Sequence, residues 1–150
     1  MVSADIYSLF FLLILLISCK NDSQLPFETL LIEEKTCENC PIVTIDIPKA
    51  VEKNDLGTTI NTALQEEIIT LLNFDEVTNV NSIETAITSF NKGYNQLKDK
   101  FPEESTKWEA IINGEVLYED KNILTIALDS YVFTGGAHGY SAKKYLNFSK

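Results

Sequence analysis

Apolar and polar residues alternate in several parts of the chain, which is the pattern of half-buried β-strands. The clearest run is Ile42–Ile47. In it, Val43, Ile45 and Ile47 would share one face of the strand, and Thr44 and Asp46 the other. Pro48 is expected to end this strand. Strand-like runs occupy these segments: Phe27–Glu33, Ile42–Ile47, Trp108–Glu119, Asn122–Phe133 and Lys143–Phe148. Asn113-Gly114 interrupts the third run, and we interpret this pair as a bulge or a short loop.

Two segments between these strands repeat apolar residues every three or four positions, which predicts amphipathic helices over about Asp55–Leu72 and Ser82–Lys100. Residues that favour helix starts precede both: Asn54 or Asp55 for the first, and Asn81 or Ser82 for the second. The predicted order is a β-hairpin, two helices and an antiparallel β-meander packed on the helices. This segregation indicates an α+β fold rather than a doubly wound parallel sheet.

The N-terminus carries an apolar run, Ile6–Ile17, of about a dozen residues, whereas a bilayer span needs roughly 20. Polar residues follow Ser18-Cys19 at once, which is typical of an export signal. The ending Leu16-Ile17-Ser18-Cys19 resembles the lipobox of bacterial lipoproteins. The likeness implies a signal peptide over 1–18, a diacylglyceryl thioether on Cys19, a tether over 19–26 and a folded domain over 27–150. The alternative interpretation is a buried N-terminal helix.

The composition excludes some classes of function. The chain has 45% hydrophobic residues, as globular proteins do, and its 22 acidic residues outweigh 12 lysines to give a net charge of −10. Without arginine, so acidic a chain is a poor nucleic-acid binder. The single histidine, His138, rules out any site within one chain that needs two imidazoles.

Cys37 and Cys40 lie at the expected hairpin turn, separated by Glu38-Asn39. In an exported protein, we expect a structural disulfide here, and a cross-link at the base of a hairpin is geometrically possible. A redox-active pair, a zinc site completed by His138, and free thiols are the alternatives. The zinc site is one ligand short, because His138 is the one further soft ligand apart from Cys19.

A glycine-rich stretch precedes the last predicted strand, and its five candidate binding residues are Thr134, Gly135, Gly136, His138 and Gly139. Three glycines in five residues permit positive φ and a tight connection between strands. The same stretch is a candidate binding loop. A phosphate cradle is not expected, because no helix follows to direct its N–H groups at an anion.

The run Thr134–Gly139 followed by Lys144–Phe148 resembles the extracytoplasmic domain family shared by the peptidoglycan deacetylase PdaC and the anti-sigma factor RsiV. Trp108, the upstream strand and the Cys-Pro start before an alternating strand fit the same layout, and the likeness covers roughly residues 27–150. It implies an α+β domain of the cell envelope. In RsiV such a domain is a receptor for lysozyme, and in PdaC it precedes the catalytic module. Such proteins usually continue into a further α/β segment, so this chain is expected to be a shortened member.

We therefore expect a non-catalytic lipoprotein of the bacterial cell envelope, held at the membrane through Cys19, that binds a cationic lysozyme-like protein or cell-wall glycan. No cofactor, metal or catalytic residue is predicted. One alternative is an enzyme that modifies cell-wall polysaccharide, using His138 with Asp129 or with Ser141 as nucleophile, or an accessory domain of such an enzyme. Another is a structural protein that self-associates through an open sheet edge.

Overall fold

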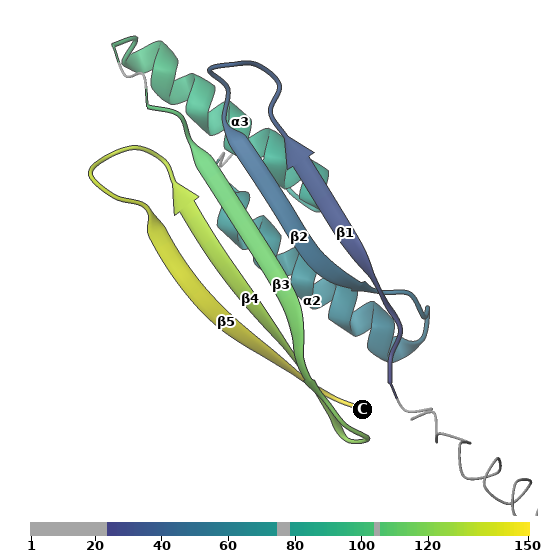
Figure 1. The fold of residues 1–150 in the computed structure, drawn as a ribbon. Helices are drawn as coiled ribbons and strands as arrows, with labels where there is room; N and C mark the ends of the chain where they lie inside the picture. Colours follow the sequence, from purple (N-terminus) through teal and green to yellow (C-terminus); the bar gives the residue numbers. More distant parts are fainter. Residues whose placement is uncertain (1–23, 75–78, 104–105) are drawn as a thin grey trace, which may run out of the picture.

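The computed structural model describes residues 24–74, 79–103 and 106–150 (Figure 1). Along the chain, its elements are β1 (Phe27–Glu34), β2 (Ile42–Ala50), α2 (Asp55–Leu72), α3 (Ile83–Lys100), β3 (Glu109–Glu119), β4 (Ile123–Phe133) and β5 (Tyr140–Ser149). This order confirms the predicted α+β fold. The predicted signal peptide and Cys19 lie outside the described residues.

The described strands form one sheet in the order β1-β2-β3-β4-β5, and both helices lie on the same side of it (Figure 1). All neighbouring strands are antiparallel except β2 and β3, which are parallel. The two helices form the long connection that a parallel pair requires. This pair joins the predicted hairpin to the predicted meander in a single sheet.

The core lies between the sheet and the helices. Alternate strand residues that face the helices are fully or almost fully buried: Val43, Ile45, Ile47, Ala110, Ile112, Leu124, Ile126 and Leu128. They pack against the apolar stripes of the helices, whose buried members include Ile60, Leu64, Ile68, Leu72, Ile87 and Phe90. In the part of the chain described here, no helix is long and apolar enough to cross a membrane.

Side-chain hydrogen bonds cap both helices at predicted positions. Asn54 Oδ1 accepts from the backbone N–H of Gly57 at 2.7 Å and begins α2. Ser82 Oγ accepts from the N–H of Thr85, and Thr85 Oγ1 accepts from the N–H of Ser82, which completes a capping box at α3.

The prediction that Pro48 ends its strand is wrong, because β2 continues to Ala50. The N–H of Val51 donates to the carbonyl of Pro26 beside β1. The odd-numbered residues of β2 therefore direct their backbone N–H and C=O groups toward β1, and the even-numbered residues direct theirs toward β3. Pairing between β2 and β3 ends at Asp46↔Asn113. The missing N–H of Pro48 therefore affects only the parallel ladder, which already ends at Asp46, and leaves the pairing with β1 intact.

The prediction of a bulge or loop at Asn113-Gly114 is also wrong. Both residues continue β3 in unbroken register with β4, and the irregularity lies instead at Leu117, between Val116 and Tyr118. A Cβ on Gly114 would lie 2.9 Å from Cδ of Pro48. The glycine therefore allows a close approach of two strands and does not mark a turn.

Candidate functional site

The sheet face opposite the helices carries no other element in the described structure (Figure 1). Because side chains alternate along a strand, residues between the buried ones point to this side. We define the open face by three cross-strand rows: Leu31, Asp46, Asn113, Asp129 and Lys143; Glu33, Thr44, Ile111, Tyr131 and Ser141; and Glu115, Ala127 and Tyr145. Leu31 is 57% exposed and Tyr145 is 53% exposed.

Charge on the open face is predominantly negative. It carries four carboxylates, those of Glu33, Asp46, Glu115 and Asp129, against one amine, that of Lys143. Same-sign charges on one face raise the local concentration of oppositely charged partners. The open face is therefore suited to approach by a cation.

Lys143 is held within its own chain, because its Nζ lies 3.0 Å from Oδ2 of Asp129 on the neighbouring strand. The hydrogen bond to Asp129, followed by the charge of that carboxylate, raises the pKa of Lys143. The ammonium therefore stays charged and neutralises Asp129, and the more distant carboxylate of Glu115 attracts it more weakly. Asp46 lies between Leu31 and Asn113 in its row, with no lysine directly opposite it.

A shallow hollow of about 370 Å³ lies between β3, β4 and β5 on this face. It is lined by Ile111, Asn113, Asp129, Ser130, Tyr131, Ser141, Ala142 and Lys143. One aromatic ring with amide, hydroxyl and carboxylate groups around it can pack against a ligand and hydrogen-bond it.

The five residues of the candidate binding loop do not line this hollow, but the last of them, Gly139, contacts Tyr131, which does. A Cβ on Gly139 would lie 2.5–2.7 Å from the far ring atoms of Tyr131, so this ring covers the glycine diagonally across the strand pair. Gly135 and Gly136 have positive φ of 102° and 88°, which suits glycine at a tight turn. The loop thus makes the tight β4–β5 turn, and Gly139 leaves room for the ring of Tyr131.

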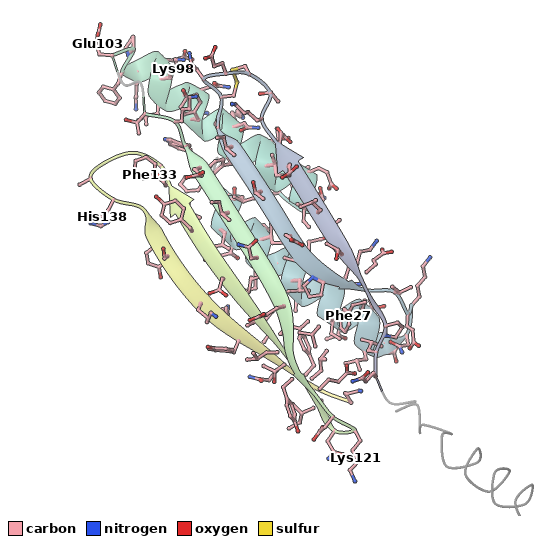
Figure 2. All side chains as sticks on the ribbon, viewed as in Figure 1. Phe27, Lys98, Glu103, Lys121, Phe133 and His138 are labelled. Atoms are coloured by element: carbon pink, nitrogen blue, oxygen red, sulfur yellow. A yellow bond between two sulfur atoms is a disulfide. The ribbon has the colours of Figure 1, made fainter. Side chains whose placement is uncertain are left out.

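His138 lies at the outer end of this loop, at the opposite end of the molecule from Lys121 (Figure 2). It is exposed, and its Nδ1 lies 3.3 Å from the carbonyl oxygen of Gly139. Asp129 is opposite Lys143 and Ser141 is opposite Tyr131. The structure therefore does not bring the predicted histidine together with the aspartate or serine of the enzyme alternative.

Cys37 and Cys40 form a disulfide in the β1–β2 connection, as predicted. The hydroxyl of Tyr94 on α3 donates to the carbonyl of Asn39 between them at 2.8 Å. Tyr94 also contacts Trp108, with ring centroids 6.0 Å apart. The cross-linked loop is thus attached to the helix layer. Within residues 24–74, 79–103 and 106–150, no three His, Cys, Asp or Glu residues are grouped to hold a metal ion.

Sequence reasoning missed the open face itself. The residues that build it are far apart in the chain, and only the parallel register of β2 with β3 places Asp46 beside Asn113. The alternation of polar residues in the predicted strands was the available signal, but it did not show which strands are neighbours.

Comparison with known proteins agrees with the resemblance inferred from the glycine-rich motif. The solved structure of a DUF3298 family member from Bacteroides fragilis NCTC 9343 matches with a TM-score of 0.63 and 21% identity, over 85% of this chain and 57% of that chain. A DUF3298 family protein from Pseudomonas aeruginosa PAO1 matches with a TM-score of 0.51 and 27% identity, over 85% of this chain and 52% of that chain. This chain thus spans little more than half the length of either.

No curated protein matches the chain. The family model described as "Deacetylase PdaC" matches residues 33–141, which is most of the folded part. Domains of this type are typically extracytoplasmic, and their function is unknown. From the fold, the motif and this match, we conclude that the chain belongs to the PdaC family.

Proposed function

We propose that this chain is a non-catalytic binding domain of the bacterial cell envelope, and that its open face binds a basic protein of the lysozyme kind. The observation that carries the proposal is the open face: a broad sheet surface with four carboxylates, one internally paired lysine and exposed apolar and aromatic groups. Charge of one sign steers a partner of opposite charge, and exposed tyrosine and leucine supply contact area.

A binding role rather than catalysis is supported by the positions of the chemically active side chains. His138 is exposed at a loop end, Asp129 is paired with Lys143, and Ser141 lies opposite Tyr131. A nucleophile needs a base within hydrogen-bond reach and a group that orients that base. This arrangement offers neither to Ser141.

The proposal is tested by calorimetric titration of the chain with lysozyme, using two variants that lose the same amount of charge. Glu33→Gln/Asp46→Asn/Glu115→Gln neutralises the open face, whereas Glu38→Gln/Glu66→Gln/Asp99→Asn neutralises three acidic residues elsewhere. We expect the first variant to weaken binding at least about tenfold, which is roughly 1.4 kcal/mol, and the second to weaken it much less. Equal weakening in both variants would reduce the effect to net charge and contradict a site on the open face.

The second candidate ligand is a cell-wall glycan, and the hollow beside Tyr131 favours it. A tyrosine ring next to Asn113, Asp129 and Ser141 could pack on a sugar and hydrogen-bond its hydroxyls. Titration with soluble peptidoglycan fragments separates the two ligands. Glycan binding predicts a signal that Tyr131→Ala abolishes and that added salt barely changes, whereas binding of a basic protein weakens strongly with salt.

We further propose that Cys19 carries the lipid that holds the domain at the membrane. Two or three acyl chains anchor a protein stably, whereas a single chain is marginal. Labelling with radioactive palmitate should be present in the full chain and absent in Cys19→Ala. Labelling that persists in this variant would contradict the anchor.

A further inference from the structure

β5 forms one edge of the described sheet, and every second residue of it directs its backbone N–H and C=O groups away from β4. The N–H of Lys150 donates to the carbonyl of Asn122 beside β4 at 2.8 Å. The even-numbered residues of β5 therefore direct their backbone N–H and C=O groups toward β4. In an antiparallel pair this direction alternates along the strand. The odd-numbered residues therefore direct their N–H and C=O groups outward: Ser141, Lys143, Tyr145, Asn147 and Ser149.

This edge has neither the bulge nor the proline by which many proteins prevent a further strand from pairing. The register of β5 with β4 is regular from Tyr140↔Val132 to Ser149↔Ile123, without a bulge, and the strand has no proline. Lys143 and Lys144 are drawn back onto their own chain by Asp129 and Glu67. The opposite edge, β1, carries three glutamates, at 28, 33 and 34, of which Glu28 pairs with Lys49 and Glu34 accepts from Asn91.

We propose that two copies of this chain associate through β5, with the strands antiparallel and Tyr145 on the two-fold axis. In that register, Lys143 faces Asn147 and Ser141 faces Ser149 on the open side, while Lys144 faces Leu146 and Ala142 faces Phe148 on the helix side. Every outward N–H and C=O of the five odd-numbered residues then has a partner. The two copies of Tyr145, each 53% exposed in the single chain, form a central cross-strand aromatic pair.

Other two-fold registers are less favourable. Outward residues must pair with outward residues, which an axis at any residue of β5 satisfies. An axis at Lys143 or Lys144 places two ammonium groups directly opposite each other, which is destabilising. An axis at Leu146 pairs only residues 143–149, and an axis nearer either end of the strand pairs fewer still. The axis at Tyr145 pairs residues 141–149 and opposes no two like charges.

A two-fold axis through this strand pair runs perpendicular to the sheet, so the open faces of both copies lie on the same side. The dimer would present one continuous sheet with two acidic faces. A ligand with two basic patches, or two ligands on one surface, could then be held by both copies at once.

The test is cross-linking of the full chain in the membranes of producing cells, through single cysteines introduced at the two sheet edges. Tyr145→Cys places a thiol on the proposed axis, and Leu31→Cys places an equally exposed one on β1, where exposure is 57%. We expect a covalent dimer with Tyr145→Cys that reductant reverses, and none above the wild-type level with Leu31→Cys. Equal dimer in both, or in neither, overturns the proposal.

The register is tested separately by co-expression of Lys143→Cys with Asn147→Cys. The mixture should cross-link efficiently, and each variant alone should not, because the proposed dimer brings position 143 opposite position 147. Efficient cross-linking of Lys143→Cys with itself would contradict the axis at Tyr145.

A proline variant tests the same strand pairing without an introduced thiol. Tyr145→Pro removes an outward N–H and leaves the hydrogen bonds to β4 intact. Sedimentation of the detergent-solubilised full chain should show a dimer that weakens at least about tenfold in this variant, with an unchanged circular dichroism spectrum. A wild-type chain that is monomeric at all concentrations would overturn the proposal.

Discussion

The ammonium of Lys150 lies 2.6 Å from Oε1 of Glu119, and their side chains are only 11% and 8% exposed. The same carboxylate oxygen accepts from the backbone N–H of Leu25 at 2.7 Å. Glu119 thus connects the segment before β1, the end of β3 and the residue after β5. These contacts hold three parts of the chain together at one end of the sheet.

Glu119→Gln is therefore expected to lower the free energy of unfolding by about 1–3 kcal/mol, because it removes the carboxylate that lies in direct contact with a nearly buried ammonium. Urea unfolding followed by circular dichroism measures this loss. Glu115→Gln, an exposed position on the same strand, is the control and should change stability by no more than about 0.5 kcal/mol. Equal losses in the two variants would show that the Glu119 contact contributes nothing specific.

Gly139→Ala is expected to displace the ring of Tyr131, because the new Cβ would lie within 2.7 Å of its far atoms. The cost should be about 1–3 kcal/mol, as for other overpacked sites. In Tyr131→Ala the space is free, so adding Gly139→Ala there should cost clearly less. Additive losses in the double variant would contradict the contact.

Gly136→Ala should cost about 1–2 kcal/mol by backbone strain alone, since no atom lies within 4 Å of its Cβ position.

The β3–β4 turn should make folding sensitive to acid through Asp120. Hydrogen bonds from the backbone N–H groups of Asn122 and Ile123, and then from the hydroxyl of Tyr118, lower the pKa of Asp120 below its ordinary 3.8. A lowered folded pKa gives stability that is present above pH 3.8 and is lost as the pH falls through the folded value.

In Asp120→Asn the amide oxygen can still accept these hydrogen bonds, so stability at neutral pH should change little, while the loss below pH 3.8 becomes smaller. Urea midpoints measured from pH 2 to pH 7 check this expectation. The hydrogen bond to Asp120, together with its charge, also raises the pKa of Tyr118 above 10.0. The same variant should bring that pKa back toward 10.0 in an ultraviolet titration. An unchanged value would contradict the Tyr118–Asp120 contact.

Reduction of the Cys37–Cys40 disulfide should lower stability by about 2 kcal/mol, because the closed ring is short. Cys37→Ser/Cys40→Ser should show the same loss and no further response to reductant. Tyr94→Phe, which removes only the hydrogen bond to Asn39, should cost about 1 kcal/mol and keep the response to reductant. A wild-type chain whose unfolding does not respond to reductant would contradict a stabilising disulfide.

Much of the fold could be predicted from the sequence because local patterns decide it. The spacing of apolar residues and the capping side chains of Asn54 and Ser82 place both helices, and alternation places all five strands. The errors arise at residues whose effect depends on which neighbouring strand they lie beside. Pro48 ends one ladder and not the other, and Gly114 relieves a contact with Pro48 that no local pattern shows.

The candidate site was less predictable, because it depends on contacts between distant segments. The sequence singled out the stretch from Thr134 to Gly139 by its composition, but the structure shows that Gly139 makes room for Tyr131. The row that joins Leu31 to Lys143 across five strands requires the parallel pairing of β2 with β3. Nothing in the order of hairpin, helices and meander specifies that pairing.

The most direct test of the proposed function is a map of the bound surface by nuclear magnetic resonance. Lysozyme is titrated into isotopically labelled chain, and the amide shifts are followed residue by residue. If lysozyme binds the open face, the largest changes fall there, at Asp46, Asn113 and Tyr145, and the exposed faces of α2 and α3 change little. Changes centred on the helices, or no change at any residue, would contradict the proposed function.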